Sequence, residues 1–144
     1  MSDSQIIIRL ILSVVLSGVI GLERQIRRRA AGLRTHILVS VGSTLIMLTS
    51  IYIFDIYKDS AQMDPARIAA GVITGIGFLG AGTIIRYGEE VRGLTTAATL
   101  WVVAALGLAV GCGFYTAAFT TTVLVILSLL LLRRLESKVL GKPY

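Results

Sequence analysis

The sequence contains a single cysteine, Cys112, and a single histidine, His36, among its 144 residues. One cysteine excludes a disulfide within the chain and a metal cluster built from cysteines. One histidine excludes a metal cluster built from histidines and a catalytic histidine pair. No serine, histidine and aspartate arrangement with supporting motifs is present. We therefore expect that the protein is not an enzyme and that it holds no cofactor, with a bound Mg²⁺ ion as the open exception.

Charged residues are also scarce, at 15% of the chain, whereas 55% of the residues are hydrophobic and the mean hydropathy is +0.83. An ordinary soluble domain is about 25% charged and about 45–50% apolar. A soluble protein of this size has too little interior volume to bury so much apolar surface. Lipid is therefore the expected solvent of most of the chain.

Five apolar stretches are each close to the ~20 residues that a helix needs to cross ~30 Å of hydrocarbon. They cover residues 5–22, 37–54, 65–85, 94–111 and 115–132. This pattern predicts an all-α polytopic membrane protein, a single domain over residues 1–144 with about five transmembrane helices. Asp64 and Pro65 mark the start of the third span, because Asp accepts hydrogen bonds from free helix N–H groups and Pro fits the first turn.

Most of the basic residues lie in alternate gaps between these spans. They are Arg24, Arg27, Arg28, Arg29 and Arg34 in the first gap, Arg86 and Arg92 in the third, and Arg133, Arg134, Lys138 and Lys142 after the last span. The positive-inside rule then predicts an external N-terminus and an internal C-terminus. The first gap lacks interleaved aromatic residues, so we expect it to contact anionic lipid headgroups and not nucleic acid.

Residues 75–82 read GIGFLGAG, and three of their glycines stand in the G-x-G-x-x-G order of dinucleotide-binding loops. Such a loop needs a preceding strand and an acidic residue about 20 positions later. Here the motif lies inside an apolar span, and the position about 20 residues after Gly80 falls at Leu100 and Trp101. The motif therefore does not indicate a nucleotide site.

Two membrane interpretations of these glycines remain open. Small residues at spacing four allow a neighbouring helix to approach closely; alternatively, a glycine-dense turn is weakly helical and can unwind to direct carbonyls at an ion. The glycines concerned are Gly71, Gly75, Gly77, Gly80 and Gly82, with Ala81 completing the second pair. Similar small-residue faces occur in the other spans, at Ser13, Ser17 and Gly21, at Ser40 and Thr44, and at Gly107 and Gly111.

Polar groups inside the spans are hydroxyls and not charges. Ionisable groups near the middle of a membrane are costly and functional, but Arg9, Arg67 and Arg86 lie near span ends, where they can reach the interface. A proton relay through a central carboxylate is therefore excluded. Threonines that bond to their own helix, or alternatively coordinate a cation, are Thr74, Thr83, Thr95, Thr96 and Thr99.

Charged and polar groups near the span ends have structural explanations as well as functional ones. The loop with Asp55, Asp59 and Asp64 offers the oxygen ligands that Mg²⁺ prefers, but their irregular spacing favours a solvated acidic loop. Glu23 is expected to form an ion pair with a nearby arginine. His36 is expected to be a hydrogen-bonded structural residue with a pH sensor as the alternative, and Cys112 a packed small side chain.

Four segments together resemble the MgtC/SapB family of bacterial inner-membrane proteins. They are "GVIGLERQ" (18–25), "GLRTHILVSVG" (32–42), "DPARIAAGVITGIGFLGAGTII" (64–85) and "RGLTTAATLWVVAALGLAVGCG" (92–113). The polar residues within these motifs are Glu23, Arg24, Arg34, Thr35, His36, Asp64, Arg67, Arg92, Thr95, Thr96 and Cys112. The resemblance implies a multi-pass protein of the bacterial plasma membrane with about five spans. Longer members carry a cytosolic C-terminal domain, so it also implies a short form without that domain.

The resemblance further implies a function linked to Mg²⁺ homeostasis, growth at low Mg²⁺ and survival inside macrophages. We expect a regulator of a membrane transporter or ATPase, working as a homo-oligomer with a dimer as the simplest closed form. The alternative is an oligomeric Mg²⁺ transporter or channel whose pathway is lined by the glycine-rich span.

Overall fold

The computed structural model of the chain describes residues 1–59, 62 and 64–140, and describes side chains as far as residue 132. Within these residues lie five helices that are long and apolar enough to cross a membrane, judged by length and composition. They are α1 (Asp3–Ile26), α2 (Leu33–Tyr57), α3 (Ala66–Thr83), α4 (Leu94–Cys112) and α5 (Tyr115–Leu140). The predicted all-α membrane fold is confirmed.

A short β-hairpin joins α3 to α4 and was not predicted. Strands β1 (Ile85–Tyr87) and β2 (Glu90–Arg92) pair antiparallel. Gly88 and Gly93 both have positive φ, the conformation that glycine adopts without steric cost. The third apolar stretch was predicted to continue to residue 85, but the helix ends at Thr83, and strands of three residues are too short to show a period of two in the sequence.

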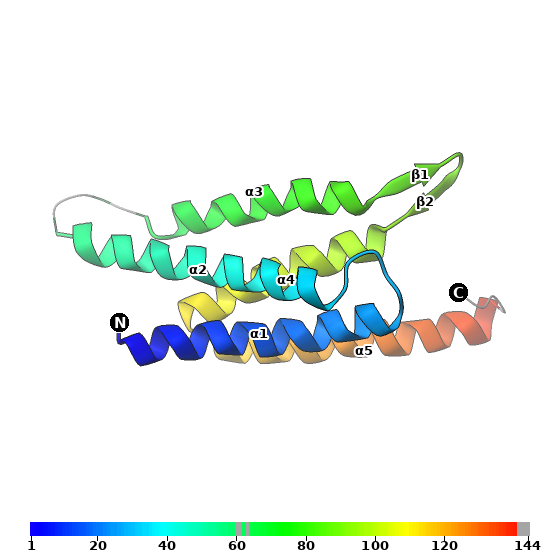
Figure 1. Cartoon of the computed structure of the whole chain (residues 1–144), viewed down its shortest axis with the longest axis horizontal. Coiled ribbons are helices and arrows are strands. Elements are labelled where there is room, and N and C mark those ends of the chain that lie inside the picture. The colour runs from blue at the N-terminus through cyan, green and yellow to red at the C-terminus, as the bar shows by residue number, and fades with distance from the viewer. Residues whose placement is uncertain (60–61, 63, 141–144) are drawn as a thin grey trace.

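The helices alternate in direction, so that the connections collect at two ends of the bundle. Figure 1 shows the N-terminus, the end of α2 and the start of α3 at one end, and the hairpin and the C-terminal part of α5 at the other. We call the latter the basic end: it comprises the α1–α2 turn (residues 27–32), the hairpin and the adjoining helix ends. The side of the membrane on which it lies stays a prediction.

Helix α4 lies at the centre and packs against each of the other four helices. One buried cluster joins α1 to α4 and α5 and contains Leu16, Ile20, Val103, Leu106, Val110 and Ala118. A second joins the α1–α2 turn to α3 and α4 and contains Ala31, Val72, Ile76, Leu100 and Ala104. Helix α3 therefore belongs to the bundle mainly through α4.

The closest helix contact lies between α4 and α2. A Cβ atom at Gly107 would overlap the carbonyl oxygen of Ser40, and one at Gly111 would lie 2.6 Å from Cβ of Met47. The hydroxyl of Thr44 donates a hydrogen bond of 2.9 Å to the carbonyl of Gly107. The predicted small-residue packing of the first, second and fourth spans is thus confirmed, since Ser13, Ser17 and Gly21 of α1 are also buried.

Arg9 joins α1 to the turn between α4 and α5. Its Nη1 donates to the carbonyl of Gly111 at 2.7 Å, and its Nε donates to the hydroxyl of Tyr115 at 3.1 Å. A cation at the C-terminus of a helix is favoured by the exposed carbonyls there. Arg9 therefore caps α4, a specific role that the expectation of a free interfacial arginine did not include.

We predict that Gly107→Ala lowers the free energy of unfolding by about 1–3 kcal/mol, because the added methyl group meets backbone that cannot move aside. The matched control is Gly77→Ala, where an added Cβ meets nothing within 4 Å. That control is expected to be neutral or to stabilise by up to about 1 kcal/mol. Thermal and denaturant unfolding in detergent measures both, and equal effects at the two positions would contradict the packing described.

Candidate functional site

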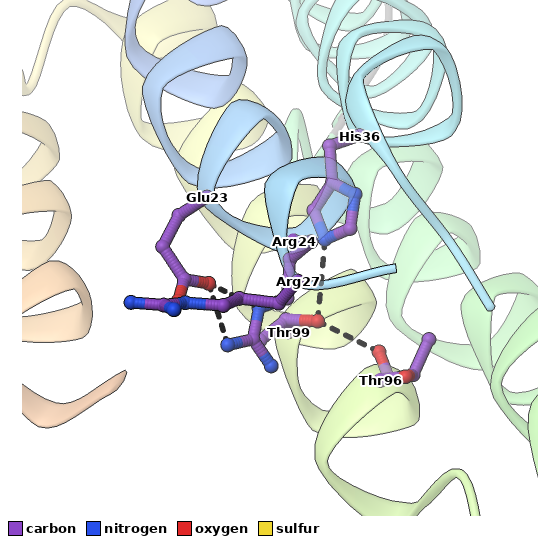
Figure 2. A network of polar contacts seen from close by, with 6 residues as sticks. All are labelled: Glu23, Arg24, Arg27, His36, Thr96 and Thr99. Atoms are coloured by element: carbon purple, nitrogen blue, oxygen red, sulfur yellow. Dashed lines mark hydrogen bonds and ion pairs between the residues drawn. The ribbon is translucent and has the colours of Figure 1, made fainter. Parts of the chain in front are cut away.

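Two neighbouring groups of polar side chains, drawn from three helices, lie near the basic end (Figure 2). Glu23 and Arg24 come from the last turn of α1, and Arg27 directly follows that helix. His36 comes from the first turns of α2. Thr96 and Thr99 come from the first turns of α4. We refer to these six residues as the three-helix polar network.

Glu23 and Arg24 form a buried ion pair. The Oε2 atom of Glu23 lies 2.5 Å from Nη2 and 2.6 Å from Nε of Arg24, and the two side chains are 11% and 5% exposed. The predicted ion pair is confirmed. Because desolvated charges are costly, removal of one partner of such a pair destabilises far more than at the surface.

The second oxygen of Glu23 is less well satisfied. Its Oε1 lies 3.5 Å from Nε of Arg27, one helical turn further along, and it is buried without a hydrogen-bond partner. One carboxylate therefore faces two guanidinium groups, so the cluster keeps a net positive charge. Positive charge at the C-terminal turn of α1 is favoured by the helix dipole.

His36 connects α2 to α4. Its ring is fully buried, with Nδ1 2.8 Å from the carbonyl oxygen of Gly32 and Nε2 3.2 Å from the hydroxyl of Thr99. A carbonyl only accepts, so the first contact requires a proton on Nδ1. In the neutral ring, Nε2 is then an acceptor for the hydroxyl of Thr99. This matches the expected hydrogen-bonded structural histidine.

The hydroxyl of Thr99 has two acceptors for one proton. Besides His36, it lies 2.9 Å from the carbonyl oxygen of Thr96, to which it can donate within its own helix. The backbone of α1 closes the site, because a Cβ on Gly21 would lie 2.9 Å from Cβ of His36. The His36–Thr99 contact therefore joins α2 to α4, α1 packs against them at Gly21, and no room is left for a ligand at the histidine itself.

The structure brings together only part of the predicted site. Glu23, Arg24, His36, Thr96 and Thr99 meet in the network. Exposed at the basic end but outside the network are Arg34, Thr35, Arg92 and Thr95. Exposed near the opposite end are Asp64, Arg67 and Cys112.

Cys112 was predicted to be packed, and this is wrong. The thiol is exposed at the C-terminus of α4 and donates to the carbonyl of Ala109 at 3.3 Å. At this point the helix has reached its last turn, where Gly113 takes over as C-cap. No neighbouring helix covers the thiol in the described part of the chain.

Within this chain, the glycines of α3 neither unwind the helix nor, with the exception of Gly80, pack against another helix. The helix runs without a break from Ala66 to Thr83, so the glycine-dense turn is not unwound. Added Cβ atoms would meet nothing within 4 Å at Gly71, Gly75, Gly77 and Gly82, and only Gly80 contacts a neighbour, Ala97 of α4 at 3.7 Å. Thr83 donates to the carbonyl of Gly80 at 2.8 Å, as expected for a threonine that bonds to its own helix, and Thr74 is exposed.

An apolar groove of about 360 Å³ lies between α2 and α3. Four small residues line it: Gly42, Ser43, Gly71 and Gly75. Larger side chains complete the lining, at Leu38, Val39, Ile46, Val72, Ile76 and Leu79. Close by in sequence, Phe78 of α3 is 84% exposed. The glycine-rich face is thus an open surface and not part of the core.

The predicted acidic loop does not present a formed metal site. Among the described residues, no three side chains of His, Cys, Asp or Glu gather as they would around a metal ion. Asp64 accepts a hydrogen bond of 2.8 Å from the N–H of Ala66, which is its predicted helix-starting role. It also lines a cavity of about 260 Å³ with Ser50, Gln62 and Arg67, where the hydroxyl of Ser50 donates to the carbonyl of Pro65.

Two functional contacts were missed by reasoning from the sequence. Arg27 lies four residues after Glu23, a spacing that indicates an ion pair on a helix, so it was detectable. Arg9 and its partners are more than 100 positions apart, and no local pattern links them.

The model of the MgtC family matches residues 10–138 of the chain. A protein of Escherichia coli K12 named "Putative magnesium transporter YhiD" is 45% identical over 143 residues, which cover 98% of this chain and 66% of that protein. "Protein MgtC" of Salmonella typhimurium LT2 is 41% identical over 137 residues, 95% of this chain and 56% of its own length. "Protein MgtC" of Brucella abortus is 47% identical over 121 residues, 84% of this chain and 48% of its own length.

The chain therefore spans about half to two thirds of the length of these relatives. No solved structure shows a significant match to it.

We predict that Glu23→Gln lowers the free energy of unfolding by about 3 kcal/mol, because Arg24 is left buried without its counter-charge. The matched control is Glu90→Gln, which removes an ion pair with Arg92 whose side chains are 62% and 72% exposed. We expect no measurable change there, since water screens the pair. Thermal unfolding of both variants in the same detergent compares them; a control as unstable as Glu23→Gln would contradict the burial of the first pair.

Proposed function

The chain belongs to the MgtC family, and from this premise we propose that it acts in Mg²⁺ homeostasis as a multi-pass protein of the bacterial inner membrane. It does so by binding and regulating another membrane protein, a transporter or an ATPase. The name of the Escherichia coli relative, which contains the words magnesium transporter, supports the connection to Mg²⁺.

The observation that carries this proposal is the open glycine face of α3. Each glycine inside a helix costs roughly 1 kcal/mol relative to alanine. Such positions are useful in a membrane when another helix backbone approaches them. Here an added Cβ atom would meet no other part of the chain at four of the five glycines. At Gly107 and Gly111 of α4, by contrast, α2 occupies the space beside the glycine. The face therefore has the properties of a docking surface for a helix of another protein.

The adjoining groove supports the same function. A transmembrane helix fits a groove lined by small residues and by leucine, isoleucine and valine, because its side chains occupy the space that the glycines leave. Phe78 is largely exposed on the same helix, and aromatic residues are frequent anchors at protein interfaces. The proposed occupant of the groove is a helix of a transporter or an ATPase. If the protein instead forms the predicted homodimer through this face, a second copy of the chain would occupy the groove.

The competing function is a cation pathway lined by α3 carbonyls and by Thr74, Thr83 and Thr99. The regular course of α3 argues for regulation instead, because helical carbonyls are engaged with their own N–H groups. Thr83 likewise donates within its own helix, and the hydroxyl of Thr99 is engaged by His36 and by the carbonyl of Thr96.

We predict that Gly71→Leu combined with Gly75→Leu leaves the protein folded but abolishes its support of growth at low Mg²⁺. An added Cβ atom meets nothing within 4 Å at either position, and both positions line the groove, so larger side chains there would occupy it. The matched control is Ser128→Leu, which adds bulk at an exposed position of α5. Growth, membrane abundance and cross-linking from a photoreactive residue at position 78 measure the effects, and normal growth of the double variant would contradict a docking role.

Purified protein in sealed liposomes distinguishes the two functions. The regulator is expected to give no Mg²⁺ flux above empty vesicles, and a partner cross-linked at position 78 is expected to be a transporter or ATPase. Metal flux that is abolished by Gly77→Leu would overturn regulation in favour of a pathway. Cross-links to a second copy alone would assign the face to a homodimer.

A further inference from the structure

Positive charge is concentrated at the basic end beyond what the polar network uses. Arg24 and Arg27 face Glu23, and Arg92 pairs with Glu90. The exposed arginines of the α1–α2 turn, Arg28 and Arg29, form no ion pair with a described side chain. The guanidinium groups of these two successive residues are therefore available to an anion from outside the chain.

The turn that carries them is held in one conformation. The N–H of Arg28 donates to the carbonyl of Gln25 at 2.9 Å, and that of Arg29 donates to the carbonyl of Arg24 at 3.1 Å, a helix-terminating pattern. The side chain of Gln25 then accepts from the N–H of Leu33 at 3.1 Å, which fixes the start of α2. Ala31 is buried against α3 and α4. The turn is anchored on both sides.

Arg28 has a positive φ of 53°. This left-handed conformation costs a residue with a side chain roughly 1–2 kcal/mol, and glycine usually occupies it. Arg28 is the one residue other than glycine with a positive φ in the described part of the chain. Residues held in such costly backbone conformations cluster at active sites and ligand-binding positions.

An apolar surface leads directly to the turn. Val19, Leu22 and Ile26 lie on one face of α1 at spacings of three and four, and all three are exposed. In a membrane this face contacts acyl chains. Since α1 ends at Ile26, the following arginines stand where the hydrocarbon gives way to headgroups. The surface thus has an apolar part that matches the acyl chains of a phospholipid, followed by a cationic part that matches its headgroup phosphate.

The N-termini of α2 and α4 add to the positive potential. Both helices begin at this end after a glycine, Gly32 and Gly93, and neither cap residue supplies a side-chain hydrogen bond to the free N–H groups. Helix N-termini carry about half a positive charge each. The exposed acids Glu89 and Glu90 lie on the hairpin, and residues 27–32 of the turn include no acid.

We propose that the α1–α2 turn is a binding site for an anionic phospholipid, with the guanidinium groups of Arg28 and Arg29 on the headgroup phosphate and the acyl chains along α1. Guanidinium groups bind phosphate oxygens through paired hydrogen bonds. The fixed turn lowers the entropic cost of binding, because both arginine backbones are already placed. This inference does not depend on the proposed function, since it concerns another face and another ligand.

The first test measures binding of phosphatidylglycerol to the full chain in a neutral detergent, by native mass spectrometry and by the shift in melting temperature. Arg28→Gln with Arg29→Gln is expected to weaken binding about tenfold or more, since each arginine near the surface contributes about 1 kcal/mol. The matched control, Arg86→Gln with Arg92→Gln, removes the same charge from the same end on the hairpin. It is expected to change binding less than threefold, because it removes only the screened long-range attraction between the hairpin arginines and the lipid phosphate.

A second variant separates binding from stability. Arg28→Gly removes one guanidinium group and relieves the backbone strain, so it is expected to melt at the same or a higher temperature while binding the lipid about fivefold more weakly. Equal losses in the turn and hairpin variants would overturn a defined site in favour of diffuse attraction. Equal stabilisation by phosphatidylcholine, or by inorganic phosphate alone, would overturn the anionic lipid as ligand.

Discussion

The close approach of α4 to α2 is the contact on which the rest of the structure depends. No side chain fits at Gly107 or Gly111, so the two backbones meet, and Thr44 can donate directly to a carbonyl of the other helix. This contact sets the register between the helices, and with it the distance from His36 to Thr99 two turns away. Helix α1 then packs into the pair through Gly21 and its serines. In lipid, where apolar surface alone does not drive helices together, such contacts supply the association.

Two groups of glycines therefore have opposite roles in one small bundle. Gly107 and Gly111 of α4 pack against α2 in the core. Most glycines of α3 have no neighbour within the chain, and two of them line a groove on the surface. Charge is divided in the same way: Glu23 and Arg24 form a buried ion pair within α1, and Arg28 and Arg29 are exposed on the turn that follows it. A rigid interior with two open faces, one apolar and one cationic, suits a protein whose partners are another membrane protein and the lipid itself.

Much of the fold and part of the site follow from local sequence. The five spans follow from apolar stretches of membrane length, and the ion pair of Glu23 follows from its distance to several arginines. The bond from Thr83 to its own helix follows from hydroxyl chemistry. Cys112 was predicted wrongly, and the sequence did not show that most glycines of α3 lack a neighbour within the chain, because a sequence shows that a position is small but not whether a neighbour covers it. Arg9 was missed as a cap for the same reason, since its acceptor lies on a distant helix.

The sequence by itself determined the solvent of the chain, the number of its spans and the alternate placement of its basic residues, because each of these depends on composition along a short stretch. The tertiary structure decided which glycines pack against another helix, which polar residues contact His36, and which arginines form no ion pair with a described side chain. These outcomes depend on contacts between helices that are far apart in sequence. A contact of that kind is set by the rotation and register of whole helices, which the packing of α4 against α2 fixes and no local pattern encodes.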